Sequence, residues 1–511
     1  MAASRVASGI LVSRVFGLVR EVTFAQYFGN GPLADAWRAA LKIPNVIQNL
    51  LGEGSLSASF IPVYVRLLEE GRKEEAGRAA GAVLGLLAVA AGALALIGSW
   101  AAPLLVAVFT IGFTGDGRAE ILVTLLRILF PMMGVLVISA WALGVLNSRR
   151  RFFISYVAPA LWNLSMIVTM VTLGGRGVAG VDLLVALAWG ALAGGVLQLL
   201  FQLPFLARYL GDARPSLNTR IAGVREIVTN FIPAVAARGA VNLGALLDTN
   251  LASLLAIGAV GAMGYAQTLY LLPISLFGLS IAAAELPELS RDRASGMSAV
   301  RERAEQAVGN VLFWMIPVTA GYIVHREAVT AIYQRGAFDE GQVAAVGLIL
   351  AVYALGLPAA GTARVLSSTF FALGDTRTPA RIAFARIAVS AGLGAALMFP
   401  LDRYVVGGLG LGAAGLAGGS AAGAWLELLL LRRKLDRRLD GLALVGGRVA
   451  RCLFAAAIAT AVGMLPGLLL PPLPPILRAG VTILPVALVY LGITRALGVS
   501  SVRLRSLFRR G

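Results

Sequence analysis

Long apolar stretches recur along the whole chain, and most of the charged residues fall in the short segments between them. The plainest apolar runs lie at 79–109, 181–207, 387–400 and 452–471. A helix needs about 20 predominantly apolar residues to cross the hydrocarbon core of a bilayer. The pattern therefore predicts an all-α polytopic membrane protein.

The apolar pattern predicts about 14 transmembrane helices. We expect them near 6–28, 33–66, 79–109, 120–147, 154–174, 181–207, 224–253, 259–287, 303–324, 341–373, 379–400, 406–432, 449–471 and 477–498. An even number of spans places both ends of the chain on the same side of the membrane.

The composition agrees with this prediction, since 58% of the 511 residues are hydrophobic and only 14% are charged. The net charge of +18 reports topology, because the basic residues fall in alternate connections, as the positive-inside rule requires. The basic connections hold Arg66, Arg72, Lys73 and Arg78, then Arg149, Arg150 and Arg151, then Arg291, Arg293, Arg301 and Arg303, then Arg432, Arg433, Lys434, Arg437 and Arg438. We expect a bacterial inner-membrane protein with both termini in the cytoplasm and no nucleic-acid partner.

Residues for ordinary enzyme chemistry are scarce. The sequence has no P-loop, no HExxH, no paired CxxC and no GxSxG motif, so we expect neither an ATPase nor another enzyme. The single cysteine, Cys452, excludes an internal disulfide, and the single histidine, His325, is expected at the surface of a loop. No metal site and no bound cofactor are predicted.

The chain repeats itself at an offset of about 225 residues. Segment 60–64 corresponds to 285–289, Pro131 to Pro358, and the basic turn 147–151 to 373–377. Six helices per repeat is an even number, so the two repeats share one orientation and form a parallel pair. We expect a six-helix lobe at 1–220, a second six-helix lobe at 221–440, and two additional helices at 441–511.

Ionised residues inside the spans concentrate in the first two helices. On an ideal helix the residues Asp35, Arg38, Lys42, Asn45, Asn49 and Glu53 share a stripe about 80° wide. Arg14 and Glu21 share one face of the first helix, and Arg20 lies about 120° away. Each such charge costs at least about 2.5 kcal/mol at mid-bilayer. The stripe must therefore line a water-filled cavity or be cancelled by ion pairs.

Two explanations of these charges stay open. Local salt bridges, Arg14 with Glu21 and Asp35 with Arg38, can serve helix packing alone. The cations Arg14, Arg20, Arg38 and Lys42 outnumber the acids Glu21, Asp35 and Glu53, however, which favours an anionic guest. In the second half, Arg238 and Arg364 either line the same cavity or pair with Asp248 and Glu285.

Several segments resemble the MurJ/MviN family, the lipid II flippases of the multidrug/oligosaccharidyl-lipid/polysaccharide exporter superfamily. The resemblance extends nearly from end to end. Its most specific parts are Ser13-Arg14-Val15-Phe16-Gly17-Leu18-Val19-Arg20, Ala34-Asp35-Ala36-Trp37, Ile43-Pro44-Asn45, Glu53-Gly54-Ser55-Leu56-Ser57, Gln334-Arg335-Gly336-Ala337-Phe338-Asp339 and Phe370 to Pro379.

The resemblance implies two six-helix lobes around a central cationic cavity, with the last two helices forming a groove for a lipid tail. It assigns the essential arginines of the first helix to Arg14 and Arg20, and the acids of the second helix to Asp35 and Glu53. The predicted substrate site comprises Arg14, Arg20, Asp35, Arg38, Lys42, Asn49, Glu53, Arg238 and Arg364. A coupling-ion site, where present, would use Asp248.

The sequence departs from the family pattern at two places. Gln48-Asn49 stands where the family has a basic pair, and Thr268 stands where it has an arginine. A threonine cannot hold a diphosphate as a cation does, so another cation must take this role. Arg38 is the first candidate and Arg238 the second.

The implied function is translocation of an undecaprenyl-diphosphate-linked peptidoglycan precursor, lipid II, to the outer leaflet by alternating access. The chain holds no ATPase, so the membrane potential or a coupled Na⁺ or H⁺ would supply the driving force. Membrane lipids and other cell-wall synthesis proteins are the further partners considered. Two alternatives remain: a flippase for another polyprenyl-diphosphate saccharide, and a membrane scaffold that does not transport.

Overall fold

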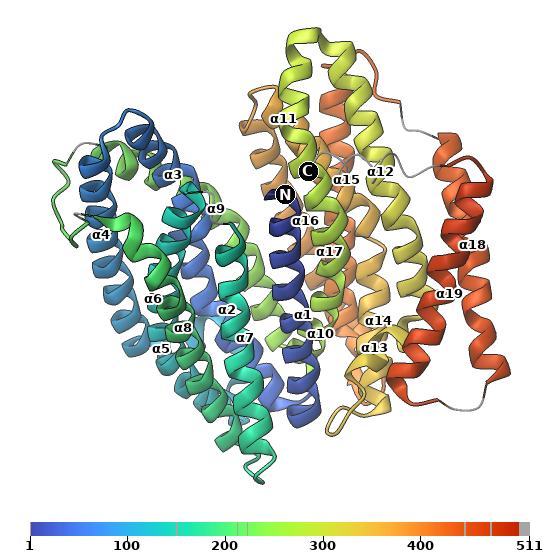
Figure 1. Cartoon of the computed structure of the whole chain (residues 1–511). Coiled ribbons are helices and arrows are strands. Elements are labelled where there is room, and N and C mark those ends of the chain that lie inside the picture. Colours follow the sequence, from blue (N-terminus) through green and yellow to red (C-terminus); the bar gives the residue numbers. More distant parts are fainter. Residues whose placement is uncertain are drawn as a thin grey trace. The chain divides into compact units, whose positions relative to one another are not determined.

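A computed structural model describes residues 2–149, 152–211, 213–221, 223–443, 446–470 and 473–499. Some side chains within these ranges, including those of Glu53 and Arg238, lie outside the description. The described chain is almost entirely helical, which confirms the all-α polytopic fold (Figure 1).

The chain divides into two compact units, the first ending at Leu254 and the second beginning at Leu255. The helices of the first unit are α1 Ala2–Phe28, α2 Pro32–Leu51, α3 Glu53–Glu69, α4 Lys73–Trp100, α5 Ala102–Phe109, α6 Arg118–Ser148, α7 Phe152–Gly174, α8 Gly180–Leu210 and α9 Val224–Ser253. A single 3₁₀ turn, Ile111–Phe113, lies between α5 and α6.

The second unit also consists mainly of helices. Its helices are α10 Ala259–Pro273, α11 Ser280–Ser295, α12 Met297–Val324, α13 Arg326–Thr330, α14 Glu340–Ala354, α15 Leu357–Ala372, α16 Arg377–Asp402, α17 Gly412–Asp436, α18 Gly446–Leu469 and α19 Pro475–Ala496. A π-helical segment, Ile274–Leu279, joins α10 to α11, and a 3₁₀ turn, Ala331–Tyr333, follows α13. Between α16 and α17 the strands β1 Val405–Val406 and β2 Leu409–Gly410 form a small antiparallel hairpin, in which Val405 is opposite Gly410.

Every predicted span has a helical counterpart, but not all of them are strongly apolar. Within the described ranges, ten helices are long and apolar enough to cross a membrane, or eleven when the bent pair α14 and α15 counts as one span. The predicted spans at 6–28, 33–66 and 224–253 do not meet this test. These are the segments whose charged residues were singled out from the sequence.

Three predicted spans are interrupted. The span at 33–66 breaks at Gly52 between α2 and α3, where an added Cβ would lie 2.4 Å from the Gln48 carbonyl oxygen. The span at 79–109 ends one helix at Trp100 and begins another at Ala102, close to a proline at the start of α5. The span at 341–373 bends by 42° between α14 and α15. Glycine and proline favour such breaks because glycine loses more backbone entropy in a helix and proline lacks the amide hydrogen that a helical bond needs.

Helix α9 packs on α2 and α3 within the first unit. The exposed pair Arg66 and Glu226, with Nη2 and Oε2 2.6 Å apart, joins α3 to the start of α9. The boundary drawn from contacts therefore follows α9, whereas the boundary drawn from the internal repeat precedes it. The lobes at 1–220 and 221–440 describe a repeat, not a contact boundary, and remain a prediction.

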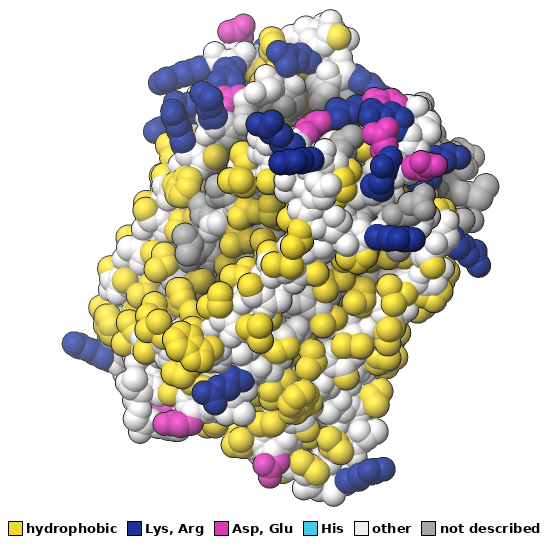
Figure 2. Space-filling model, turned by 90° about the vertical axis from the view of Figure 1, so that its left-hand side faces the viewer, with side chains coloured by type: hydrophobic (Ala, Val, Ile, Leu, Met, Phe, Trp, Pro, Cys, Tyr) yellow, Lys and Arg dark blue, Asp and Glu magenta, His cyan; other side chains and the backbone are white. Residues whose placement is uncertain are grey.

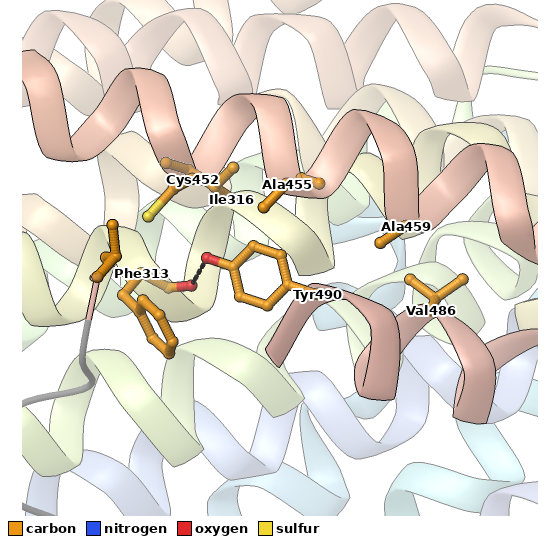
Figure 3. Packing of buried hydrophobic residues seen from close by; sticks show 9 residues of the cluster. Phe313, Ile316, Cys452, Ala455, Ala459, Val486 and Tyr490 are labelled. Atoms are coloured by element: carbon orange, nitrogen blue, oxygen red, sulfur yellow. Dashed lines mark hydrogen bonds between the residues drawn. The ribbon is translucent and has the colours of Figure 1, made fainter. Parts of the chain in front are cut away.

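The helices α18 and α19 pack on each other and on α12 (Figure 3). Their shared core contains Phe313, Cys452, Val486 and Tyr490. The buried Tyr490 hydroxyl donates to the Phe313 carbonyl at 2.6 Å, so its polar end is satisfied inside this apolar contact. The lipid-tail groove expected at 441–511 remains a prediction.

One face of the molecule carries a broad band of hydrophobic side chains, with Lys and Arg gathered mainly beyond one edge of the band (Figure 2). Exposed apolar side chains such as Leu96 and Trp100, which are 75% and 84% exposed, are typical of a lipid-facing surface. The band is what a membrane-spanning protein needs, because lipid takes the place of a packing partner.

Candidate functional site

A buried carboxylate in α1 organises the first charge cluster. Glu21 is 3% exposed, and one of its oxygens accepts a hydrogen bond from Arg20 while the other accepts one from Arg38 of α2. Two guanidinium groups thus share one carboxylate. We call this set, Arg20, Glu21 and Arg38, the Glu21 cluster.

Aromatic rings cover both arginines of the Glu21 cluster. The guanidinium carbon of Arg20 lies 5.2 Å from the ring centroid of Trp162 in α7. That of Arg38 lies 5.6 Å from the Phe24 ring centroid. A cation over an aromatic face gains about 0.5–2 kcal/mol, so these rings hold the two forks in place while the arginine side chains stay 16% and 11% exposed.

The local salt bridges predicted from the sequence differ from the ion pairs in the structure. Glu21 pairs with Arg20 and Arg38, not with Arg14, which lies two turns away on the same face of α1. Asp35 pairs with Arg118 at the start of α6, with Nη1 and Oδ2 2.8 Å apart. Helical spacing predicted the wrong partners because it relates only residues of the same helix. In the structure Glu21 of α1 also bonds Arg38 of α2, and Asp35 of α2 bonds Arg118 of α6.

Two other members of the α2 stripe, Lys42 and Asn49, face α9. Asp248 of α9 is an electrostatic neighbour of Lys42. Two turns further, the Asn49 side-chain amide donates to the Asn242 side-chain oxygen at 3.3 Å. Polar side chains thus run along the contact between α2 and α9, and Asp248, the predicted coupling-ion residue, lies beside an ammonium group.

Arg14 differs from Arg20 and Arg38. Its side chain is exposed, and among the described residues it makes no ion pair or hydrogen bond. The predicted site residues Glu53 and Arg238 have side chains outside the described residues. The structure therefore brings together Arg20, Arg38, Lys42 and Asn49 along α1, α2 and α9.

The second unit holds a second charge cluster, which we call the Glu427 cluster: Arg364 of α15, Arg386 of α16 and Glu427 of α17. Arg386 Nη1 donates to Glu427 Oε2 at 2.8 Å. Arg364 is exposed and lies within electrostatic range of Glu427, Arg386 and Tyr270. Among the described residues Arg364 has no ion pair of its own.

Two further residues of the second unit, Glu285 and Thr268, bond groups other than a predicted site residue. Glu285 pairs with Arg303 at the start of α12, with Nη1 and Oε2 3.1 Å apart, so it is not a partner of Arg364. The Thr268 hydroxyl donates to the Gly264 carbonyl of its own helix at 2.9 Å. Arg303 was not predicted as the partner of Glu285. It lies in a basic connection between two spans, so its charge was attributed to membrane topology.

The single histidine is a correction to the sequence analysis. His325 is 9% exposed, not a surface residue, and its Nε2 lies 3.0 Å from the Thr460 carbonyl of α18. It sits where α12 ends, against α18, because the turn there folds back onto the additional helices. Within the described chain no cluster of three or more His, Cys, Asp or Glu side chains can hold a metal.

Two of the most specific sequence motifs form turns. In 370–379 the positive φ of Gly374, 81°, reverses the chain, and Asp375 accepts hydrogen bonds from the Thr378 amide and hydroxyl at 2.9 and 2.7 Å. These bonds and Arg438 lower the pKa of Asp375 to about 2. In 334–339 the Asp339 carboxylate caps α14 by accepting from the Gln342 amide at 2.8 Å. Both motifs are explained by chain geometry and need no ligand.

A family model described as "Lipid II flippase MurJ" matches residues 24–471 of this chain. A "Probable lipid II flippase MurJ" of Rhizobium meliloti is 31% identical over 434 residues, which cover 83% of this chain and 78% of that protein. A "Lipid II flippase MurJ" of Burkholderia cenocepacia is 31% identical over 442 residues, covering 84% of this chain and 82% of that one.

The fold is similar to a solved structure described as "Lipid II flippase MurJ, inward closed conformation". The two superpose with a TM-score of 0.79 over 96% of this chain and 98% of that one, at 22% sequence identity. At this identity the likeness concerns the fold alone.

Proposed function

The chain belongs to the MurJ family of lipid II flippases, and from this premise we propose that it moves lipid II across the bacterial inner membrane. The cargo would be an undecaprenyl diphosphate that carries the peptidoglycan precursor. It would pass from the cytoplasmic to the outer leaflet by alternating access, in which the binding site opens to one side at a time.

The observation that carries this proposal is the surplus of arginine in α1 and α2. Two guanidinium groups share the single Glu21 carboxylate, and Arg14 is exposed and makes no ion pair among the described residues. Planar guanidinium groups match the paired oxygens of a diphosphate. An anionic guest would supply the charge that the helices lack.

The proposed substrate site includes both the neutral and the charged members of the stripe. Its members would be Arg14, Arg20, Asp35, Arg38, Lys42, Asn49 and Glu53 of the first three helices, with Arg238 of α9 and Arg364 of α15. Arg38 would take the place of the cations that are missing at Gln48 and Thr268. Asp35 would orient this set and need not meet the cargo.

We propose that both termini lie in the cytoplasm and that the membrane potential drives transport. The basic turn between α3 and α4 contains Arg72 and Lys73, and such turns stay inside. A negative interior favours outward movement of an anion by about 2.3 kcal/mol per charge per 100 mV. Asp248 remains the candidate for a coupled Na⁺ or H⁺, in competition with the Lys42 ammonium.

A second candidate substrate follows from Thr268. Its hydroxyl is bound within its own helix, so it offers a cargo neither a charge nor a free donor. This favours a related polyprenyl diphosphate with a different saccharide. Cell-wall synthesis proteins remain proposed partners.

The test is rescue of bacterial cells depleted of their own lipid II flippase, followed by lipid II flipping in vesicles of purified protein. We expect the wild-type chain to support growth and flipping, and Arg14→Ala and Arg38→Ala each to reduce the flipping rate about tenfold or more, because a charged bidentate contact contributes about 1.5–3 kcal/mol. Arg176→Ala, in the exposed turn between α7 and α8, is the matched control.

Two outcomes contradict the proposal. Normal growth of the depleted cells without any lipid II reaching the outer leaflet would exclude flipping. Efficient flipping of another polyprenyl diphosphate together with failure on lipid II would favour the second substrate.

A further inference from the structure

Arg118 and Asp35 form the most deeply buried ion pair of the described chain. The two side chains are 3% and 0% exposed. Asp35 lies in the first turn of α2, and Arg118 is the first residue of α6. The pair therefore joins two helices at the ends where both begin.

The Arg118 guanidinium is fully used. Besides the Asp35 contact, its Nε donates to Asp116 Oδ2 at 2.7 Å and its Nη2 donates to the Gly112 carbonyl at 3.1 Å. The Phe113 ring lies beneath it, with the centroid 4.1 Å from the guanidinium carbon. Arg118 also holds the pKa of Asp116 below its usual range. These contacts occupy the Arg118 guanidinium, so it is not available to bind a cargo.

The segment around Arg118 is also fixed to α9. The Gly112 amide donates to the Ser253 hydroxyl at 3.2 Å, and the Asn250 amide donates to the Val108 carbonyl at 2.8 Å. A Cβ on Gly112 would lie 1.9 Å from the Ser253 carbonyl oxygen, so this approach requires glycine. The connection from α5 to α6 thus ties α2, α6 and α9 together within the first unit.

The orientation of α2 matters because of what it carries. Arg38 follows Asp35 by one turn and Lys42 by two. Arg38 must reach Glu21 of α1, and Lys42 must reach the vicinity of Asp248 of α9. A rotation or shift of the first turn of α2 would move both cations together.

We infer that Arg118 is a positioning residue for transport, and that Asp35 acts by holding Arg118 and α2 in place instead of touching the cargo. The inference rests on the proposed function, but it also makes a claim about α2 that no transport assay is needed to test. Asp35 has no exposed surface, and its carboxylate already binds the Arg118 guanidinium. Both observations disfavour direct contact between Asp35 and an anionic lipid.

The experiment compares Asp35→Asn, Arg118→Gln and the double variant. Asp35→Asn leaves Arg118 with the partly exposed Asp116 as its remaining carboxylate partner, and Arg118→Gln removes the guanidinium that the buried Asp35 binds. The double variant places two neutral amide side chains at this contact. We expect each single variant to flip lipid II at least about tenfold more slowly per folded protein, and the double variant to return to within about threefold of wild type. A merely structural role would lower the yield or Tm and leave the rate per folded protein unchanged.

A second readout does not depend on the cargo. Asn45 is exposed on the α2 stripe, so Asn45→Cys in a Cys452→Ser background reports the position of α2 through its rate of thiol labelling. We expect this rate to change about threefold or more in each single variant and to recover in the double variant. If wild-type protein fails to flip lipid II while labelling follows this pattern, the proposed function fails and the positioning role stands.

Asp116→Asn is the matched control, because it removes a partly exposed carboxylate from the same arginine without releasing α2. We expect its flipping and labelling rates to stay within about threefold of wild type. Should Asp35→Asn not be recovered as folded protein, Arg118→Lys replaces it: lysine keeps the charge but lacks the fork that reaches Asp35 and Gly112 together, so slower flipping is expected.

Three results would overturn the inference. A double variant as inactive as Asp35→Asn would show that Asp35 itself meets the cargo. Labelling of the Asn45→Cys thiol that is unchanged in every variant would show that α2 does not move. Flipping by Arg118→Lys at the wild-type rate would show that the guanidinium fork is dispensable.

Discussion

The Glu21 cluster and the Glu427 cluster have the same composition, two arginines and one glutamate, but they are built differently. In the first, both carboxylate oxygens of a 3% exposed residue are engaged, one by Arg20 and one by Arg38. In the second, one arginine bonds the carboxylate, whose side chain is 13% exposed, while Arg364 stays exposed beside the pair.

The difference separates two ways of arranging two arginines around one carboxylate. In the Glu21 cluster both guanidinium groups bond the carboxylate and lie over aromatic rings, so the cluster is a fixed part of the first unit. In the Glu427 cluster the Arg364 side chain is exposed beside the pair and makes no ion pair among the described residues. The first arrangement suits a preorganised anion site, and the second suits a contact made only when a guest arrives.

The largest expected effect is that of Glu21→Gln. It leaves two buried guanidinium groups facing one neutral amide, and loss of one partner from a buried ion pair costs about 3–5 kcal/mol. We expect the free energy of unfolding to fall by about that amount, measured by reversible denaturation in mixed micelles. Thr23→Ala is the control on the same helix, because the Thr23 hydroxyl donates to the Val19 carbonyl of that helix. Equal decreases in the free energy of unfolding for the two variants would contradict the stabilising role given to Glu21.

Glu427→Gln should have a smaller effect. Arg386 is 28% exposed, so water can solvate its guanidinium once the carboxylate is lost, and we expect a decrease of about 1–3 kcal/mol in the free energy of unfolding. The double variant Arg386→Gln with Glu427→Gln should regain most of the loss. A cost for Glu427→Gln as large as that for Glu21→Gln would break the comparison between the clusters.

The fold could be predicted from the sequence because hydrophobic periodicity determines membrane spans directly. Each predicted span is helical in the structure, but three of them consist of two helices, and the breaks at Gly52 and between α14 and α15 did not follow from the hydropathy pattern. Hydropathy is averaged over a window of residues, so it does not detect one or two residues at which the backbone departs from the helix. Local signals, such as Gly52 and the proline at the start of α15, were present but not decisive.

The candidate site was only partly predictable. The α2 stripe was found because charged residues inside a span stand out at helical spacing. Their partners were not: Arg118 lies beyond a loop and Arg386 and Glu427 lie on separate helices, so only tertiary packing brings them to Asp35 and to each other. Sequence spacing identifies which residues need a partner, and the fold decides which partner they obtain.

Arg364→Gln should reduce transport with little effect on stability. The Arg364 side chain makes no ion pair within the described chain, so we expect the free energy of unfolding to change by less than about 0.5 kcal/mol. The flipping rate should fall about tenfold if its charge meets the anionic cargo. Arg386→Gln is the matched variant, for which we expect the reverse order: a clear loss of stability and a smaller loss of rate. Similar behaviour of both arginines would mean that the Glu427 cluster acts as one fixed unit.

Asp375 gives the reference for a carboxylate at the membrane surface, and its contribution to stability should be smaller than those of Glu21 and Glu427. Its carboxylate caps the first turn of α16 and lies 2.6 Å from Arg438 Nη2. A partly buried helix cap that pairs with an exposed arginine contributes about 1 kcal/mol. The folded-state pKa, about 2, lies below the ordinary value of 3.8, so the contribution is present above about pH 4 and is lost as the pH falls toward 2. The difference in Tm between wild type and Asp375→Asn should therefore be constant from pH 6 to 8, and should shrink near pH 3 for as long as the protein stays folded. A difference that grew on acidification would mean that the Asp375 carboxylate is protonated, not ionised, in the folded protein.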